Sequence, residues 1–433
     1  MVTVVASVKP GTGAGAAPNW VARLETPSAK LNRYLAGSCL LIVSLLAPGA
    51  VAQITEPLLP LLPGPAPISA PTAPAGAPGE RPTYAGETVT SRARPEYDPI
   101  GIRLGDFFFY PRGELDEAYN SNIFATTTAP TYDLITSVLP SFDLLSIFPR
   151  SSLNIHGNAW QQIYADHPAQ NTQDGTIAVD GRLGVSSGSS LFGNAQVAHQ
   201  HISYGSPNSP GNIAQPVTYW SYLARGGYQQ TGRRFTYGVD AGISAAQYNA
   251  APLVGGGVSP QSTQDASVSD VAINAGYEIV PDYIGYVRVD GALYDYWHTL
   301  PGGGTRPNSR VYRADVGLQI APRHLIYGQV YVGYLVQDFI ASSLGSTSNP
   351  DFGGRLIWNV TPLTTLTLGG LRTYNTGNTS SGVNGVSGPN GSGYLTTTVA
   401  VNADHELRRD VLLNVNASMK TTASRASPAP IMS

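Results

Sequence analysis

The stretch GTIAVDGRLGV, residues 175–185, decides the fold. Its apolar residues fall at alternate positions from Ile177 to Val185, and Asp180 and Arg182 stand between them. Successive side chains of a β-strand point to opposite faces, so this period of two predicts a strand with one apolar and one charged face. The question is which face meets water.

The same alternation recurs along most of the chain after residue 107, for example over 235–243, 271–279 and 312–320. We count about fifteen such segments, each long enough for the roughly 9–11 residues of a membrane-spanning strand. No amphipathic helical period competes with them over a comparable length. The chain is therefore expected to be all-β.

The connections between these segments alternate in length. Short ones such as 186–190 and 321–324 take turns with long Gly/Ser/Asn-rich ones such as 249–264, 342–350 and 375–393. This rhythm puts all tight turns at one end of the strands and all long loops at the other. A propeller would have shorter strands and blade repeats.

Strand length and loop asymmetry together favour an antiparallel, up-and-down transmembrane β-barrel of about 15–16 strands. The apolar face then meets lipid, and the charged face lines a wet interior. Because backbone groups in lipid need internal partners, the sheet has to close on itself. The aromatic strand end at Tyr219, Trp220 and Tyr222 fits an interfacial girdle.

The composition is consistent with a chain that is surrounded partly by lipid and partly by water. Only 12% of the 433 residues are charged, whereas 42% are hydrophobic. The formal net charge of −3 argues against a nucleic-acid partner. Cys39 is the only cysteine, so no intramolecular disulfide is expected.

The N-terminal region resembles a secretory signal. Lys30 and Arg33 precede an apolar stretch over 35–46, and the small residues Ala50 and Ala52 predict cleavage before Gln53. A short membrane anchor is the alternative. We divide the chain into a leader (1–52), a Pro-rich periplasmic segment (53–102), the barrel (103–419) and an irregular tail (420–433).

The last alternating segment ends at Met419, and residues 420–433 contain two prolines without alternation. Bacterial single-chain barrels normally have an even number of strands, whereas our count is odd. We therefore hypothesise that the reading frame is truncated or frameshifted near residue 420 and lacks at least one closing strand.

Charged residues between the apolar positions are the candidate lining of the interior. Several form i, i+2 pairs of opposite sign, such as Arg288 with Asp290. One interpretation is a neutralised wall that stiffens the barrel, and the other is a set of charges that selects solutes. The predicted lining residues are Asp180, Arg182, Asp240, Arg288, Asp290, Arg313, Asp315, Arg355 and Arg372.

Residues for catalysis are scarce. His199 and His201 lie two apart and could share a metal, although polar residues at a membrane boundary explain them as well. No Ser–His–Asp motif or phosphate-binding loop accompanies them. We expect no catalytic residue, no cofactor and no metal.

Residues 94–124 carry a resemblance to a known family. The segments RPEYDPIGIRLGDFFFYP (94–111), YNSNIF (119–124) and LITSVLPSFDL (134–144) resemble the entry region of the type 2 β-barrel porins. The resemblance implies an outer-membrane barrel of a Gram-negative bacterium, with outer-membrane lipid and the barrel assembly machinery as partners. Some relatives are associated with exopolysaccharide export, which suggests polysaccharide-export components as further partners.

Three hypotheses for function follow. The first is an outer-membrane pore for passive solute diffusion or exopolysaccharide export, without an enzymatic step. The second is a plugged structural or adhesive barrel whose long extracellular loops bind partners. The third is a barrel-embedded enzyme that uses His199 or His201.

Overall fold

The structure is a computed structural model of the chain. It describes residues 6–7, 38–46, 86–92, 99–126, 128–204, 209–299, 306–321, 324–342, 346–376, 393–409 and 411–424. The predicted cleavage site at Ala50, Ala52 and Gln53 and most of the Pro-rich segment lie outside these residues. No helix in the described part of the chain is long and apolar enough to cross a bilayer.

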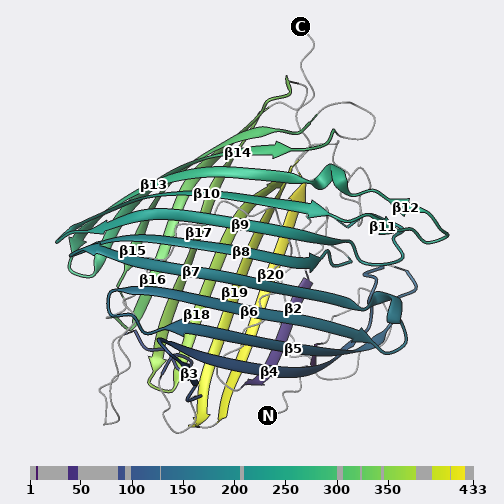
Figure 1. Ribbon diagram of the computed structural model, residues 1–433, viewed down its shortest axis with the longest axis horizontal. Helices are drawn as coiled ribbons and strands as arrows, with labels where there is room; N and C mark the ends of the chain where they lie inside the picture. The colour runs from purple at the N-terminus through teal and green to yellow at the C-terminus, as the bar shows by residue number, and fades with distance from the viewer. Residues whose placement is uncertain are drawn as a thin grey trace, which may run out of the picture.

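The described residues form one long antiparallel meander (Figure 1). Its main strands are β4 (Phe107–Asn120), β5 (Asp133–Ser146), β6 (Ser151–Tyr164), β7 (Thr172–Ser186), β8 (Ser189–His201), β9 (Thr218–Thr231), β10 (Phe235–Tyr248), β13 (Ala266–Val280), β14 (Tyr283–Tyr296), β15 (Ser309–Ile320), β16 (Ile326–Phe339), β17 (Ser346–Thr361), β18 (Thr364–Thr376), β19 (Gly393–Arg408) and β20 (Val411–Ser424). Each pairs with the next, which confirms the predicted all-β, up-and-down architecture.

The strand limits differ from expectation in two places. The expected loop over 342–350 is partly strand, because β17 begins at Ser346 and Pro350 pairs with Tyr334 in β16. At the other end, β20 continues to Ser424 instead of ending at Met419, with Ser424 opposite Tyr394 of β19. Backbone pairing with β19 extends this strand where the apolar alternation has already stopped.

The sheet continues past β20 into the N-terminal region. Strand β2 (Ser38–Leu46) pairs antiparallel with β20, and β1 (Ala6–Ser7) pairs with β2 and contacts β4. The residues of β2 are those of the apolar stretch in the predicted signal peptide. They make a sixteenth long strand after the fifteen of the meander within the described chain.

The two faces of the sheet carry different side chains. One face, here called the outer face, exposes aliphatic residues such as Ile177 (60% exposed), Val289 (54%) and Val332 (61%). The opposite, inner face carries buried charged residues such as Asp290 (3%) and Asp315 (2%). In Figure 1 the strands β4–β10 run across the front of the molecule, and β17–β20 lie behind them at a large angle. The sheet therefore curls back on itself around its inner face.

Large side chains of the inner face lie flat on glycines of the next strand. Tyr286 of β14 is in register with Gly317 of β15, and Tyr331 of β16 is in register with Gly353 of β17. A Cβ atom at Gly353 would lie only 2.6 Å from Oη of Tyr331, so the ring needs a residue without a side chain there. The wall is therefore closely packed along β14–β17.

The long loops pack together at one end of the strands. Tyr204, beyond β8, donates a hydrogen bond to Gln170 in the short helix η1 (Pro168–Gln170), and Gln170 donates to the Ala214 carbonyl. Ala214 in turn donates its N–H to Pro252 of strand β11 (Ala251–Pro252). Burial in this loop layer raises the pKa of the Tyr204 hydroxyl to about 12.

Tyr219 belongs to this layer and not to an aromatic girdle. It is 2% exposed and stacks on Tyr248 at 5.0 Å between ring centroids. Trp220 and Tyr222, in contrast, are 43% and 39% exposed, as a girdle requires.

Candidate functional site: the charged inner face

Arginine and aspartate side chains form a continuous network on the inner face of β9–β17. It is assembled from three guanidinium groups and five carboxylates, here called the Arg–Asp network: Arg225, Asp240, Asp270, Arg288, Asp290, Arg313, Asp315 and Asp351. All eight side chains are 10% exposed or less. The carboxylates outnumber the guanidinium groups, so the network carries an excess of negative charge.

Strand register brings these groups together. Asp290 of β14 is directly opposite Arg313 of β15, and Arg288 is opposite Asp315. Cross-strand neighbours of opposite charge on one face attract each other. The i, i+2 spacing that the sequence shows therefore becomes a two-by-two arrangement in which each arginine has an aspartate along its strand and one across it.

Asp290 is the centre of the network. Its Oδ1 accepts hydrogen bonds from Arg313 Nη2 at 2.9 Å and from Arg288 Nε at 3.3 Å. Arg313 also lies 3.3 Å from Asp315 and 3.6 Å from Asp351. Removing one partner from such a buried set leaves the others uncompensated, which is costly.

Arg225 extends the network to β10 and β13. It forms a short ion pair with Asp240, and its Nη2 lies 2.5 Å from Asp270 Oδ2. Asp240 then connects to Arg288 at 3.5 Å. The chain of contacts runs unbroken from β9 to β17.

A second, more open group lies on β4–β7. Nδ1 of His156 is 2.6 Å from Asp143, and Nε2 is 2.9 Å from Asp180. Arg112 donates to Asp143 at 2.5 Å, and Asn154 donates to Asp180 at 3.1 Å. Ionised carboxylates only accept hydrogen bonds, so both contacts of His156 require a doubly protonated ring.

These side chains, here called the His156 group, are accessible from the interior. Asp180 and His156 are 46% and 40% exposed. Arg182 does not pair with Asp180, its i, i+2 neighbour, but donates to Ser190 at 3.0 Å and to Gln229 at 3.4 Å. The charges on this wall can contact solutes directly, whereas the buried charges of the Arg–Asp network act on solutes only through their electrostatic field.

Arg355 and Arg372 lie on opposite faces. Arg355 is exposed on the inner face, where it pairs with Gln329 and Gly369. The structure places Arg372 on the outer face instead, since it pairs with Thr397 and its guanidinium lies 5.5 Å from the ring centroid of Phe352. The sequence assigned Arg372 to the inner face by alternation, but Leu366 and Leu368 set the phase of this strand and put Arg372 on the outer face.

Three members of the Arg–Asp network were missed from the sequence. Asp270 alternates with the apolar row that starts at Val271, so the pattern contained it. Arg225 is followed by Gly226 and Gly227, which have no side chain and so do not indicate which face of the strand Arg225 occupies. Asp351 was missed because the apolar row of its strand was expected to begin at Phe352, after the loop over 342–350.

His199 and His201 do not meet at a common site. The His199 ring packs 4.9 Å from the Trp220 ring, and its Nδ1 lies 2.8 Å from the Gln173 carbonyl. Nδ1 of His201 lies 2.8 Å from Asp174. The described residues contain no group of three or more potential metal ligands.

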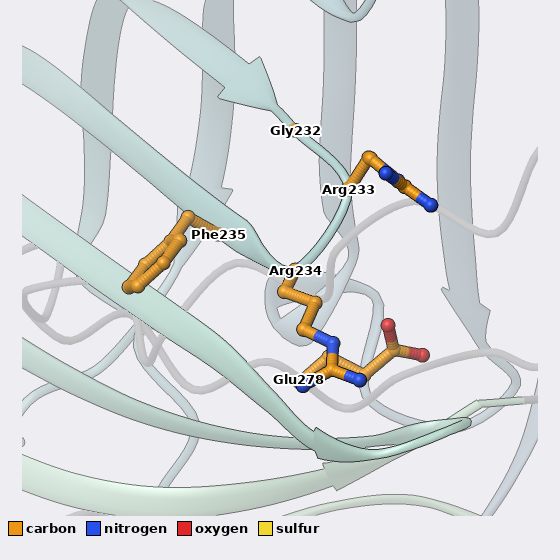
Figure 2. A pocket seen from close by; sticks show the side chains of 5 residues that line it. All are labelled: Gly232, Arg233, Arg234, Phe235 and Glu278. Carbon is orange, nitrogen blue, oxygen red and sulfur yellow. The ribbon is translucent and has the colours of Figure 1, made fainter.

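A shallow pocket lies at the β9–β10 turn, lined by Gly232, Arg233, Arg234, Phe235 and Glu278 (Figure 2). Phe235 points away from Arg234 and Glu278 and is 65% exposed on the outer face. Arg234 donates to Tyr277 at 3.4 Å. The pocket marks the boundary between the apolar band and the charged turns.

Comparisons with known proteins agree with this architecture. The sequence model of a family described as "Putative beta-barrel porin 2" matches residues 94–425. No match was found among curated proteins.

Solved structures with a similar fold are distant in sequence. The siderophore receptor PiuA from Acinetobacter baumannii has 12% identity and a TM-score of 0.39, over 76% of this chain and 65% of that chain. The toluene transporter TodX from P. putida has 8% identity and a TM-score of 0.30, over 77% and 92%. A BenF-like porin from Pseudomonas fluorescens Pf-5 has 11% identity and a TM-score of 0.30, over 74% and 100%. This chain thus spans less than two thirds of the PiuA receptor's length.

Proposed function

Because this chain belongs to the β-barrel porin family matched over residues 94–425, we propose that it is a pore for passive diffusion of small hydrophilic solutes, with a preference for cations. Its location is the outer membrane of a Gram-negative bacterium. Solutes cross through the interior of the barrel without a chemical step.

The observation that carries this proposal is the charge balance of the Arg–Asp network on the inner face. The Arg–Asp network has five carboxylates and three guanidinium groups. Charged rings along a pore favour counter-ions and repel co-ions. An excess of fixed negative charge therefore supports passage of cations over anions.

The exposed His156 group and Arg182 tune this preference where solutes pass. Arg182 is exposed on the inner face and is held by two hydrogen bonds to neutral side chains, so its charge is uncompensated there. Removing this charge should raise the preference for cations.

The experiment is single-channel recording of the purified protein in a planar bilayer, beside the Arg182→Ala variant. We expect stable open steps for both and a larger cation preference for the variant. Permanent silence from protein shown to be folded and inserted would contradict the pore.

A second candidate function is an occluded barrel whose long loops bind partners outside the cell. The hydrogen-bonded loop layer around Tyr204, Gln170 and Ala214 favours it, because three loops (β6–β7, β8–β9 and β10–β13) hold one another in place at the extracellular end. Absence of open steps, together with partner binding that is lost when the 249–264 loop is shortened, would select this function.

Export of a polysaccharide is the third possibility and rests on the family resemblance. The recordings can test it, because a polymer that enters the interior blocks the current. Transient block by a neutral oligosaccharide added on the short-turn side would support export, and an unchanged current would favour diffusion of small solutes.

A further inference from the structure

Residues 86–92, which precede the barrel, are seated against it at the short-turn end. This mouth segment (residues 86–92) buries Val89 to 1% exposure. The Val89 N–H donates a hydrogen bond to Oγ1 of Thr365 at 3.0 Å, and Thr365 is likewise 1% exposed. The contact joins residues that are 276 positions apart in the chain.

Two further strands hold the backbone of the mouth segment. The hydroxyl of Tyr327 in β16 donates to the Gly86 carbonyl at 2.7 Å. The side-chain amide of Asn359 in β17 donates to the Glu87 carbonyl at 3.0 Å. The wall thus supplies partners for successive peptide groups of the segment.

Arg92 fastens the other end of the segment. Its guanidinium donates to the Pro362 carbonyl in the β17–β18 turn and lies 3.6 Å from Glu406 of β19. Within the segment, the Thr88 N–H donates to Ser91 Oγ at 2.8 Å, and the Ser91 N–H donates to Thr88 Oγ1 at 3.0 Å. The segment therefore forms a hydrogen-bonded turn and is not an extended linker.

The contacts are made on the inner face. The neighbours of Asn359 along β17, Trp358 and Val360, are 45% and 39% exposed on the outer face. Next to Glu406, Leu407 is 54% exposed on the outer face. Tyr327, Asn359, Thr365 and Glu406 alternate with such residues, so the mouth segment lies inside the opening that the short turns surround.

We propose that the mouth segment is a releasable constriction at the periplasmic mouth of the pore, seated on a binding surface formed by β16–β19. This inference rests on the proposed pore function. The segment covers the inner wall of four successive strands, and ions that leave the barrel at this end pass beside it. The contacts described above are hydrogen bonds, an ion pair and a buried valine, so substitutions at these positions should loosen the segment.

The test combines an accessibility readout with a conductance readout. Val89→Cys is introduced with Cys39→Ser, and its reaction with a maleimide is followed in folded protein. The release variant adds Tyr327→Phe and Thr365→Val, which remove one donor and one acceptor with little change in shape. The matched control is Tyr331→Phe, on the same strand and face, whose hydroxyl has no partner among the described residues.

We expect slow labelling in the parent and control, and about fivefold faster labelling for each hydrogen bond removed in the release variant. The same release variant, without the added cysteine, should show a larger unitary conductance than Tyr331→Phe. Fast labelling in the parent would overturn the seating of the segment.

Two results separate this inference from the proposed function. Open steps of equal size in parent, control and release variant, with faster labelling in the release variant, would overturn the constriction and leave the pore intact. Silence of all three proteins in folded, inserted form would overturn the pore, and the constriction with it.

Discussion

Two walls of the same barrel carry their charges in different ways. On β9–β17 the Arg–Asp network is 10% exposed or less, and each arginine contacts two or three carboxylates. On β4–β7 the His156 group is open, with Asp180 46% exposed. Charge that is buried and shared stiffens a wall, because each group holds its neighbours in place. Charge that stays exposed contacts solutes directly, whereas the buried charge acts on them only through its electrostatic field.

The largest difference in stability between the two walls is expected when the centre of the Arg–Asp network is removed. Asp290→Asn leaves Arg288 and Arg313 without their shared carboxylate, and we expect a loss of about 3–5 kcal/mol in the free energy of unfolding. Denaturant unfolding followed by tryptophan fluorescence measures it.

The control for this substitution comes from the other wall. Asp180→Asn makes the same chemical change at an exposed position, where an ion pair contributes about 1 kcal/mol or less. Equal losses for the two variants would show that the walls do not differ in the way described here.

A glycine substitution tests the packing of the inner face along β14–β17. Gly353→Ala pushes a Cβ atom against the Tyr331 hydroxyl, and we expect a loss of about 1–3 kcal/mol in stability. On β4, a Cβ atom at Gly113 meets nothing within 4 Å. Gly113 lies on the outer face next to Arg112, so Gly113→Ala serves as a control for the glycine-to-alanine change alone and should change the unfolding midpoint little. Equal losses at Gly353 and Gly113 would contradict the packing of Tyr331 as the cause.

The pH dependence of ion selectivity tests whether the His156 group acts on passing ions. Protonated His156 contacts both Asp143 and Asp180, with Arg112 and Asn154 as the other polar neighbours on these carboxylates. Deprotonation removes one positive charge from an exposed wall. Cation preference should rise as pH increases through the titration of the imidazole.

His156→Gln removes the titrating ring and should abolish this part of the pH dependence. Reversal potentials recorded in a salt gradient at several pH values provide the readout. A pH dependence that is the same in the parent and in His156→Gln would mean that other groups cause it.

The smallest expected effect concerns the two arginines that the sequence assigned to the same face and the structure puts on opposite faces. Arg355→Gln removes an inner-face charge and should shift the reversal potential slightly toward cation selectivity. Arg372→Gln lies on the outer face and should leave selectivity unchanged. A shift in Arg372→Gln that matches the one in Arg355→Gln would contradict the register of β18.

Much of the architecture could be predicted from the sequence. Strict alternation, as in 175–185, fixes both the extended conformation and the two faces, because a strand has no other way to separate Val179 from Asp180. The rhythm of short and long connections then fixes the meander. These features are local, so one sequence is enough to recognise them.

The contacts of the Arg–Asp network could not be predicted from the sequence in the same way. The contact of Arg225 with Asp270 crosses from β9 to β13, and that of Arg313 with Asp351 crosses from β15 to β17. Such contacts depend on register and twist across several strands. The error at Arg372 has a local cause, since Gly369 and Gly370 interrupt the apolar pattern between Leu368 and Arg372.

The mouth segment shows most clearly which contacts the sequence alone cannot predict. Residues 86–92 have no alternation and follow a proline-rich stretch, so their composition predicts a linker. Their structure comes from partners on β16–β19 that are more than 200 residues away in the sequence. No local pattern encodes a contact of that kind.

The central claim is that the inner face lines a water-filled, cation-preferring path. Its most direct test is the reversal potential of the parent protein in a planar bilayer under a KCl gradient at neutral pH. The account predicts open steps whose reversal potential lies toward the potassium equilibrium potential. Open steps that reverse toward the chloride equilibrium potential, or no steps from folded and inserted protein, would contradict it.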